Sequence, residues 1–487
     1  MTHARFTAGL AVSLVALTFA AGCAVGPDYR SPPPPAGSEA PWVSRDPALE
    51  STQSPPDAWW RLYNDPRLDG FVAEAFAANA DLAAAESNLA AARAVLEAAR
   101  NDQYPATTTS FGAVYGRDAT ANAIFSAVGE RPRSLWKFDD LLDVSYELDL
   151  FGRVRRSIEA SRADTEAAAA VRDGVSITVA AETTRAYAQV CTLGEELVVA
   201  RRSLGVVAHE VEITVRTRAA GAGTEFDVVR AQALTEQVRS AIPLLEGQRR
   251  AAVFELAALL GRTPAYAPAE AEACVTPPRL AVLIPVGDGA ALLARRPDVR
   301  QAERRLAADT ARIGVAVADL YPRISLTGLY GGAGSSVSGL TAERALTWGV
   351  GPTISWSFPN LAGPRARVHQ AKSETAAALA GFDSTVLQAL KETEQALVVY
   401  RSELDHREVL ARVQSKAHRA FDIANSEYLA GAVSPLDLLI AEQTQVAADA
   451  DVAASDAALV ENQIRVFKAL GGGWIMASRS RTAGTPQ

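Results

Sequence analysis

The residues from Arg153 to Ala219 form a run without proline, and this run constrains the fold more than any other feature of the sequence. A helix of about 67 residues is about 100 Å long at a rise of 1.5 Å per residue. Alternating steps of three and four, typical of a left-handed coiled-coil seam, predict an elongated bundle rather than a globule. The apolar or small residues at these steps are Val190, Leu193, Leu197, Ala200, Leu204, Val207 and Val211.

The same plan occurs twice along the chain. Two turns, AGAGTEFD at Ala220–Asp227 and AGAVSPLD at Ala430–Asp437, lie 210 positions apart. A second long run extends from about Pro364 to Ala430. Each long run is preceded by an opening helix and followed by a returning helix, and these shorter helices are about half its length. The returning helices are predicted at Thr224–Leu260 and Ser434–Leu470, and the opening helices at Leu68–Arg100 and Ala290–Asp319.

Four short segments alternate apolar residues with small or polar ones, which is the period of a β-strand. In TWGVGPTISWSF, one face carries Trp348, Val350 and Ile354, and the other carries small residues. Such strands are typical of a membrane barrel, and a soluble sheet with one wet face is the alternative. Four strands are too few to close into a membrane barrel, and an open sheet edge in lipid leaves backbone groups without hydrogen-bond partners. The barrel must therefore be shared among chains. The strands are predicted at about Thr107–Arg117, Leu141–Phe151, Arg323–Gly332 and Leu346–Phe358.

The N-terminal segment is predicted to be a signal for export. Arg5 precedes the apolar run Phe6–Ala20, which is too short for a stable membrane span, and the sequence AAGC then ends at Cys23. This arrangement resembles a bacterial lipobox, so we expect Cys23 to be lipidated. Ala24 stands where an aspartate would favour the inner membrane, so the outer membrane is expected. A plain signal peptide with an incidental cysteine is the alternative.

Two further cysteines would reach an oxidising compartment after export. A disulfide between Cys191 and Cys274 is one outcome, and two free thiols are the other. Nothing in the sequence brings these two residues together, and we therefore expect free thiols.

The order of these features predicts how the chain is divided. Four consecutive prolines after Cys23 cannot join a helix or a sheet ladder, so an extended tether is expected there, with regular structure beginning after WWRLYNDP at Trp59–Pro66. A proline-rich stretch joins the two copies. The expected parts are a signal peptide at 1–22, a lipidated tether at 23–60, a first repeat at 61–261, a linker at 262–289, a second repeat at 290–473 and a tail at 474–487.

Composition argues against several classes of function. The net charge is -8 and there is no basic footprint, so we do not expect nucleic acid binding. Four histidines fall on predicted helices without close ligand spacing, which indicates solvated helix faces rather than a metal site. These are His209, His369, His406 and His418. No catalytic constellation is present, and we expect neither an enzyme nor a cofactor.

Several stretches together resemble the TolC-like outer membrane factor family, in its lipoprotein branch of OprM- and NodT-type efflux channels. They span nearly the whole mature chain in the right order. The matching stretches are GCAVGPDY at Gly22–Tyr29, YELDLFGRVR at Tyr146–Arg155, LLARRPDVRQAERRLAADTARIGVA at Leu292–Ala316, YPRISLTG at Tyr321–Gly328 and KALGGGW at Lys468–Trp474.

The resemblance implies an α+β membrane protein with the TolC-like fold. Three identical chains would share a transmembrane β-barrel, with four strands from each chain, and a long coiled-coil α-barrel in the periplasm. The channel would be the passive exit duct of a tripartite efflux system for small molecules, docked onto a periplasmic membrane-fusion adaptor and an inner-membrane pump of the RND type. The outer membrane duct of a type I protein secretion system and a structural periplasmic tether are the alternatives.

The resemblance also assigns roles to residues of the two turns. Asp227 and Asp437 match the family's tip aspartates, and Tyr428 matches a tyrosine that bonds the first-copy aspartate. Leu436 and Asp437 would face the constriction, where three copies of Asp437 would form a cation-binding ring. Two residues depart from the family pattern. Val433 replaces a basic residue, and Ile440 replaces a second aspartate, so a less acidic and more apolar ring is expected.

A simpler role is open to both aspartates, since each follows a turn and begins a helix. Capping or first-turn stabilisation of the helix would explain them without a gate. The turns themselves are expected to contact the adaptor. Their residues are Gly221, Gly223 and Thr224 in the first copy and Gly431, Val433 and Ser434 in the second.

Overall fold

The computed structural model describes residues 24–44, 46, 50–117, 123, 125–129, 131, 134–280 and 283–472. Contacts divide the chain into two units, each assembled from separate stretches of sequence. The first contains 1–32, 89–168 and 302–382, and the second contains 33–88, 169–301 and 383–487. The predicted lipidation site, Cys23, lies outside the described residues. Among the described helices, none has the apolar length that a membrane crossing requires.

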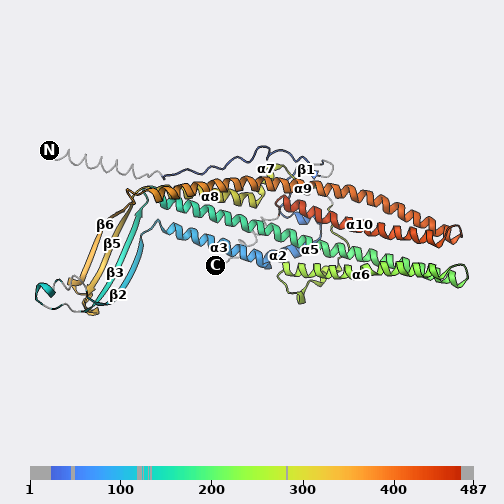
Figure 1. The fold of residues 1–487 in the computed structure, drawn as a ribbon, viewed down its shortest axis with the longest axis horizontal. Coiled ribbons are helices and arrows are strands. Elements are labelled where there is room, and N and C mark those ends of the chain that lie inside the picture. Colours follow the sequence, from blue (N-terminus) through green and yellow to red (C-terminus); the bar gives the residue numbers. More distant parts are fainter. Residues whose placement is uncertain are drawn as a thin grey trace. The chain divides into compact units, whose positions relative to one another are not determined.

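The first unit contains one antiparallel sheet of four strands in the order β2-β3-β5-β6 (Figure 1). β2 spans Ala106–Gly116, β3 Leu135–Leu148, β5 Arg323–Gly334 and β6 Leu346–Ser355. The four predicted strands are therefore present. β3 begins six residues before the predicted start, because its pairing with β2 continues to Gly116, which lies opposite Leu135. Two short 3-10 helices, Val337–Gly339 and Glu343–Ala345, lie between β5 and β6.

The two faces of this sheet differ in character, as the alternation predicted. On one face the hydroxyl oxygens of Thr327 and Thr353 lie 3.1 Å apart across β5 and β6. On the other face Trp348, Val350 and Ile354 are 71%, 70% and 66% exposed. A single chain thus leaves a contiguous apolar face without a protein covering, which marks a surface for lipid or another apolar partner.

The long helices closely match their predicted ranges, because neither run contains a proline beyond its first turn. α5 spans Arg153–Ala219 and α9 spans Ala362–Leu429. The returning helices, α6 at Glu225–Leu259 and α10 at Pro435–Ala469, have 35 residues each. Within the second unit, α5 with α6 and α9 with α10 form two antiparallel hairpins (Figure 1).

The opening helices were each expected to be continuous, and both are broken. α2 at Pro66–Ala78 ends at Asn79, whose side chain accepts a hydrogen bond from Leu82 and so begins α3 at Ala80–Asn101. α7 at Gly289–Arg295 and α8 at Pro297–Ala318 are separated by Arg296. Pro297 disfavours helical backbone in Arg296, the residue before it. The buried guanidinium of Arg296 donates hydrogen bonds to the carboxylates of Asp298 and Glu392 and to the carbonyl oxygen of Ala469.

The segment expected to be an extended tether contains regular structure before Trp59. β1 at Glu50–Ser51 pairs in parallel with β4 at Ile284–Pro285, which lies in the predicted linker. Trp59 begins a 3-10 helix, Trp59–Tyr63, and its fully buried ring stacks on Phe467 at 4.7 Å. Two more 3-10 turns, Pro264–Tyr266 and Ala269–Ala273, follow α6. Regular structure therefore begins before the predicted boundary, whereas residues 27–40, which include the four prolines, contain no helix or strand.

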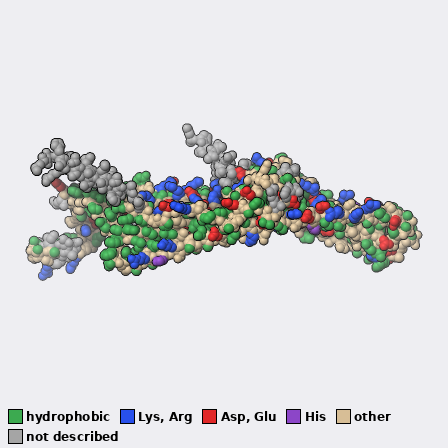
Figure 2. Space-filling model, turned by 90° about the horizontal axis from the view of Figure 1, so that it is seen from above, with side chains coloured by type: hydrophobic (Ala, Val, Ile, Leu, Met, Phe, Trp, Pro, Cys, Tyr) green, Lys and Arg blue, Asp and Glu red, His purple; other side chains and the backbone are tan. Residues whose placement is uncertain are grey.

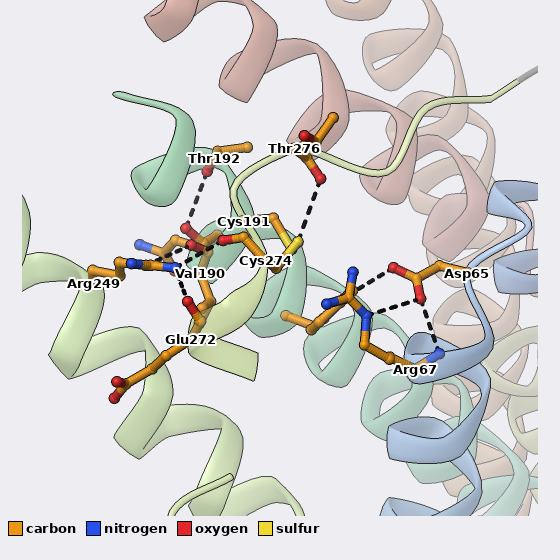
Figure 3. The surroundings of a disulfide bond; sticks show 11 residues. Asp65, Arg67, Val190, Cys191, Thr192, Arg249, Glu272, Cys274 and Thr276 are labelled. Carbon is orange, nitrogen blue, oxygen red and sulfur yellow. Dashed lines mark hydrogen bonds and ion pairs between the residues drawn. A yellow bond between two sulfur atoms is a disulfide. The ribbon is translucent and has the colours of Figure 1, made fainter. Parts of the chain in front are cut away.

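Cys191 and Cys274 form a disulfide, so the expectation of two free thiols was wrong (Figure 3). The bridge ties α5 to the segment after α6, and both cysteines are at most 2% exposed. Arg249 on α6 donates to the carbonyl oxygens of Val190 and Cys274, at 3.2 and 2.8 Å. These contacts bring together residues 83 positions apart, which spacing along the chain does not reveal.

Candidate functional site

The two predicted turns have the same backbone structure. Gly221 and Gly431 follow α5 and α9 with φ of 80° and 74°, a region that favours glycine. The next amide in each turn, at Ala222 and Ala432, donates to a carbonyl five residues earlier, at 3.0 and 2.8 Å. This is the Schellman arrangement that ends a helix. The repeated sequence pattern thus produces two equivalent reversals of the chain.

Each turn leads into a capping box. The Asp227 amide donates to the Thr224 hydroxyl oxygen at 3.2 Å, and the Thr224 amide donates to Asp227 Oδ2 at 3.0 Å. Ser434 and Asp437 repeat both bonds at 3.3 and 3.2 Å. The capping interpretation is therefore confirmed for both aspartates.

These bonds also keep the two aspartates charged. A hydrogen bond from the Thr224 hydroxyl, with one from its backbone amide, lowers the pKa of Asp227 below its ordinary value. Ser434 lowers the pKa of the exposed Asp437 in the same way. All the bonds to Asp437 use Oδ2. The side chain of Asp437 is exposed at the start of α10, so its carboxylate is open to solvent or to another chain.

Removing one cap should loosen its turn. Ser434→Ala is expected to destabilise the start of α10 by about 1 kcal/mol, because the Asp437 amide loses its acceptor. Amide hydrogen exchange of the peptide covering 432–440 measures this as about fivefold faster exchange. Ser426→Ala, which removes a hydroxyl inside α9, is the matched control and should leave that peptide unchanged. Equal exchange rates in wild type and Ser434→Ala would contradict the capping role.

Asp227 and Tyr428 were expected to bond, and the structure gives them different partners. The Tyr428 hydroxyl lies 3.5 Å from Thr217 Oγ1, across the two hairpins. Asp227 bonds with Thr224, and no bond between Asp227 and Tyr428 is found in the described part of the chain. Their pairing stays a prediction for an assembled oligomer.

The first turns of α10 separate exposed from buried side chains. Leu436 and Ile440 are 39% and 50% exposed, whereas Leu438 and Leu439 are 1% and 7% exposed. Leu436, Asp437 and Ile440 are therefore available to a surface outside the chain. Val433 and Gly223 lie in the turns and are half-buried. The role of these residues in a constriction is a prediction.

An apolar seam joins the two hairpins behind the turns. Val207 of α5, Leu234 of α6 and Leu439 of α10 form one buried cluster, with Val446 of α10 packed against it. Glu442 lies on α10 between Leu439 and Val446 and is 1% exposed. The sequence analysis did not identify this carboxyl. Its spacing of three and four residues from two apolar positions of the seam could have indicated that it lies on the buried face of α10.

Charged side chains of both signs occur along the described helices. On the face shown in Figure 2, basic and acidic side chains are interspersed over the helices rather than gathered by sign. Across the described residues, no group of three or more His, Cys, Asp or Glu side chains is placed to hold a metal ion.

Comparison with known proteins places the chain among outer membrane channels. The family described as outer membrane efflux protein matches residues 71–262 and 290–472. Outer membrane protein OprJ of Pseudomonas aeruginosa is 30% identical over 474 residues, covering 96% of each chain. Nodulation protein T of Rhizobium leguminosarum bv. trifolii is 28% identical over 440 residues, covering 89% of this chain and 90% of that protein.

Solved structures share the fold over nearly the whole chain. The outer-membrane channel OprN superposes with a TM-score of 0.86 at 34% identity, covering 93% of this chain and 100% of that one. The open state of the MtrE outer membrane channel of Neisseria gonorrhoeae superposes with a TM-score of 0.80 at 26% identity, covering 93% of this chain and 99% of that one. The expected TolC-like fold is confirmed.

Proposed function

Because this chain belongs to the outer membrane efflux protein family, we propose that it is the passive exit duct of a tripartite efflux system for small molecules. The observation that carries this is the four-stranded sheet, which has one exposed apolar face and one polar face. A single chain cannot bury that face or pair both edges. The same chain supplies helices of 67 and 68 residues, which suit a duct that extends into the periplasm.

Three copies would complete the sheet. β2 and β6 are its edge strands, and an unpaired edge in lipid leaves backbone groups without partners at several kcal/mol each. Pairing β6 of one copy with β2 of the next removes every edge and yields twelve strands. Lipid at Cys23 would add an anchor to the same outer membrane.

The partners follow from the two turns. A ring of three chains brings six equivalent turns to one end of the helical duct, where a periplasmic membrane-fusion adaptor and an inner-membrane pump of the RND type would dock. The proposed adaptor contacts are Gly221, Gly223, Thr224, Gly431, Val433 and Ser434.

The cargo of similar proteins differs from one to the next. OpmQ of Pseudomonas putida is described as exporting pyoverdine, TtgF as exporting toluene, and CusC of Escherichia coli as part of a cation efflux system. We propose a toxic small molecule as the cargo here.

Leu436, Asp437 and Ile440 would form the constriction of this duct. Asp437 is exposed and its capping bonds leave it ionised, so three copies around a narrow pore would attract cations. Ile440 would make the constriction more apolar. Asp227 and Tyr428 are proposed to hold the turns together when the constriction is closed.

Channel recordings test the constriction. Asp437→Asn keeps a side-chain acceptor for the capping box and removes the charge, so trimers in planar bilayers should show at least about threefold weaker block by divalent cations. Asp451→Asn, on an exposed part of α10, is the matched control and should behave as wild type. Unchanged conductance and cation block in Asp437→Asn would refute the proposed ring of Asp437 carboxylates. An absence of pores in wild type would refute the proposed function.

A further inference from the structure

The side chain of Glu442 is buried without a partner. It is 1% exposed, and neither of its carboxylate oxygens has a hydrogen-bond partner in the part of the chain that the structure describes. A buried polar group without a partner is costly, and a buried charge without a partner is costlier still. Its burial is complete within a single chain and does not depend on a second copy.

Two apolar side chains flank Glu442 on its own helix. Leu439, one turn earlier, and Val446, one turn later, both belong to the cluster that joins the two hairpins. Val207 of α5 packs in the same cluster and is fully buried. Since residues three and four apart lie on one helix face, the carboxyl sits in the middle of the apolar seam.

A second carboxyl faces the same seam from the other hairpin. Glu210 lies three residues after Val207 on α5 and is half-buried. It lines a small cavity together with Ala231 of α6 and Leu439 of α10. Burial and the charge of Glu210 together raise the pKa of Glu442 to about 7, and burial also raises the pKa of Glu210.

The other charged groups near the seam do not neutralise this pair. Arg230 of α6 lines the same cavity, but it lies over the Phe226 ring and lowers the pKa of Asp227. The exposed His209 on α5 lowers the pKa of Glu210, but burial raises that pKa by more, so the net shift is upward.

A histidine of α9 lies beside α10 in this region, and it has its own partners. His418 Nε2 lies 2.7 Å from Asp449 of α10, and Gln445 contacts the other ring nitrogen at 3.3 Å. The oxygen of the Gln445 amide has no partner among the described residues. The histidine is therefore engaged beside the seam and does not compensate Glu442.

We propose that Glu442 and Glu210 form a proton-binding site between the two hairpins, and that the bound proton holds the seam closed. With the proton bound, Glu442 is neutral and the apolar seam can pack around it. Without the proton, Glu442 carries a charge of the same sign as Glu210 inside the apolar seam, and the closed packing of the hairpins is disfavoured. This inference rests on the proposed function, in which the hairpins of three chains would surround one end of a duct.

The direction of the pH dependence follows from proton binding. The closed seam binds the proton more tightly than an opened, hydrated seam does, so raising the pH shifts the equilibrium toward opening. The shift begins above the ordinary pKa of a glutamate and ends once the pH passes about 7, the raised value for Glu442. Between pH 6 and pH 8 the opening equilibrium should increase about tenfold.

Hydrogen exchange of full-length trimers tests this directly. After correction for the intrinsic dependence of exchange on pH, the peptide covering 438–448 should exchange about tenfold faster at pH 8 than at pH 6 in wild type. Glu442→Gln has nearly the same shape and cannot ionise, so its corrected rates should be equal at both pH values. Glu210→Gln removes the repulsion and should give a smaller ratio than wild type.

The control variant is Glu212→Gln, which removes an exposed glutamate two residues from Glu210 and should keep the wild-type ratio. Equal corrected rates in wild type at the two pH values would overturn the proposal, whether or not the variants fold. So would a tenfold ratio that persists in Glu442→Gln. Planar-bilayer recordings separate this result from the proposed function: absent pores refute the duct alone, since the exchange experiment does not depend on conductance.

Discussion

Val350→Lys is expected to abolish assembly of the trimer in the outer membrane. Val350 lies in the middle of β6 and is 70% exposed on the apolar face of the sheet. A lysine on the lipid face of a membrane sheet costs about 2–4 kcal/mol near the middle of the bilayer, and three copies would each bear that cost. Heat-modifiable trimers, quantified from outer membrane fractions on gels, should fall by more than about a hundredfold.

The matched control places the same lysine on the opposite face. Thr353 lies three residues further along β6, and its hydroxyl contacts Thr327 on the polar face. Thr353→Lys should leave most of the trimer intact, because a water-filled interior accepts a charged side chain. Equal losses in both variants would show that the strand tolerates lysine at neither face, and equal retention would show that the apolar face does not meet lipid.

Loss of the disulfide is expected to lower the free energy of unfolding by about 4 kcal/mol. The bridge between Cys191 and Cys274 closes a loop with a sequence separation of 83, and it restricts the unfolded chain more than a short loop would. For a chain of this size, the Cys191→Ala, Cys274→Ala double variant should unfold about 4 °C lower. Thermal loss of the helical circular dichroism signal measures the change.

A reductant provides the control for this prediction. Wild-type protein that is reduced and alkylated after partial unfolding should unfold at the lower temperature, and the double variant should not respond to the reductant. If the intact and reduced wild-type proteins unfold at the same temperature, with mass spectrometry confirming the two redox states, the bridge does not contribute to stability. The result matters because export delivers the chain to a compartment where such bonds persist.

The elements that could be predicted are those determined by short-range pattern. α5 begins and ends at the predicted residues, because the run contains no proline and the turn at Gly221 ends it. The strands were visible from their alternation, which reports two different environments on two faces. The turns were visible from glycine followed by a hydroxyl and an aspartate, and these residues form Schellman turns and capping boxes in the structure.

The elements that were missed depend on partners far along the chain. Asn79 interrupts an otherwise helical pattern, and its side chain donates to the Leu259 carbonyl of another helix. Arg296 interrupts the second opening helix and bonds with Glu392 and Ala469. The helical pattern continues through both places and predicted continuous helices, although Pro297 was a local signal for the second break.

The sequence by itself determined the long helices, the two-faced strands and the paired turns, because periodicity and capping act over a few residues. Only the tertiary structure decided that Cys191 meets Cys274 and that the Tyr428 hydroxyl lies near Thr217 of the other hairpin. It also decided that Glu442 is enclosed in the seam between two hairpins. Burial and pairing depend on which surfaces come together in the fold. An amphipathic pattern predicts that one face of a helix is covered, but it does not identify the residues that cover it.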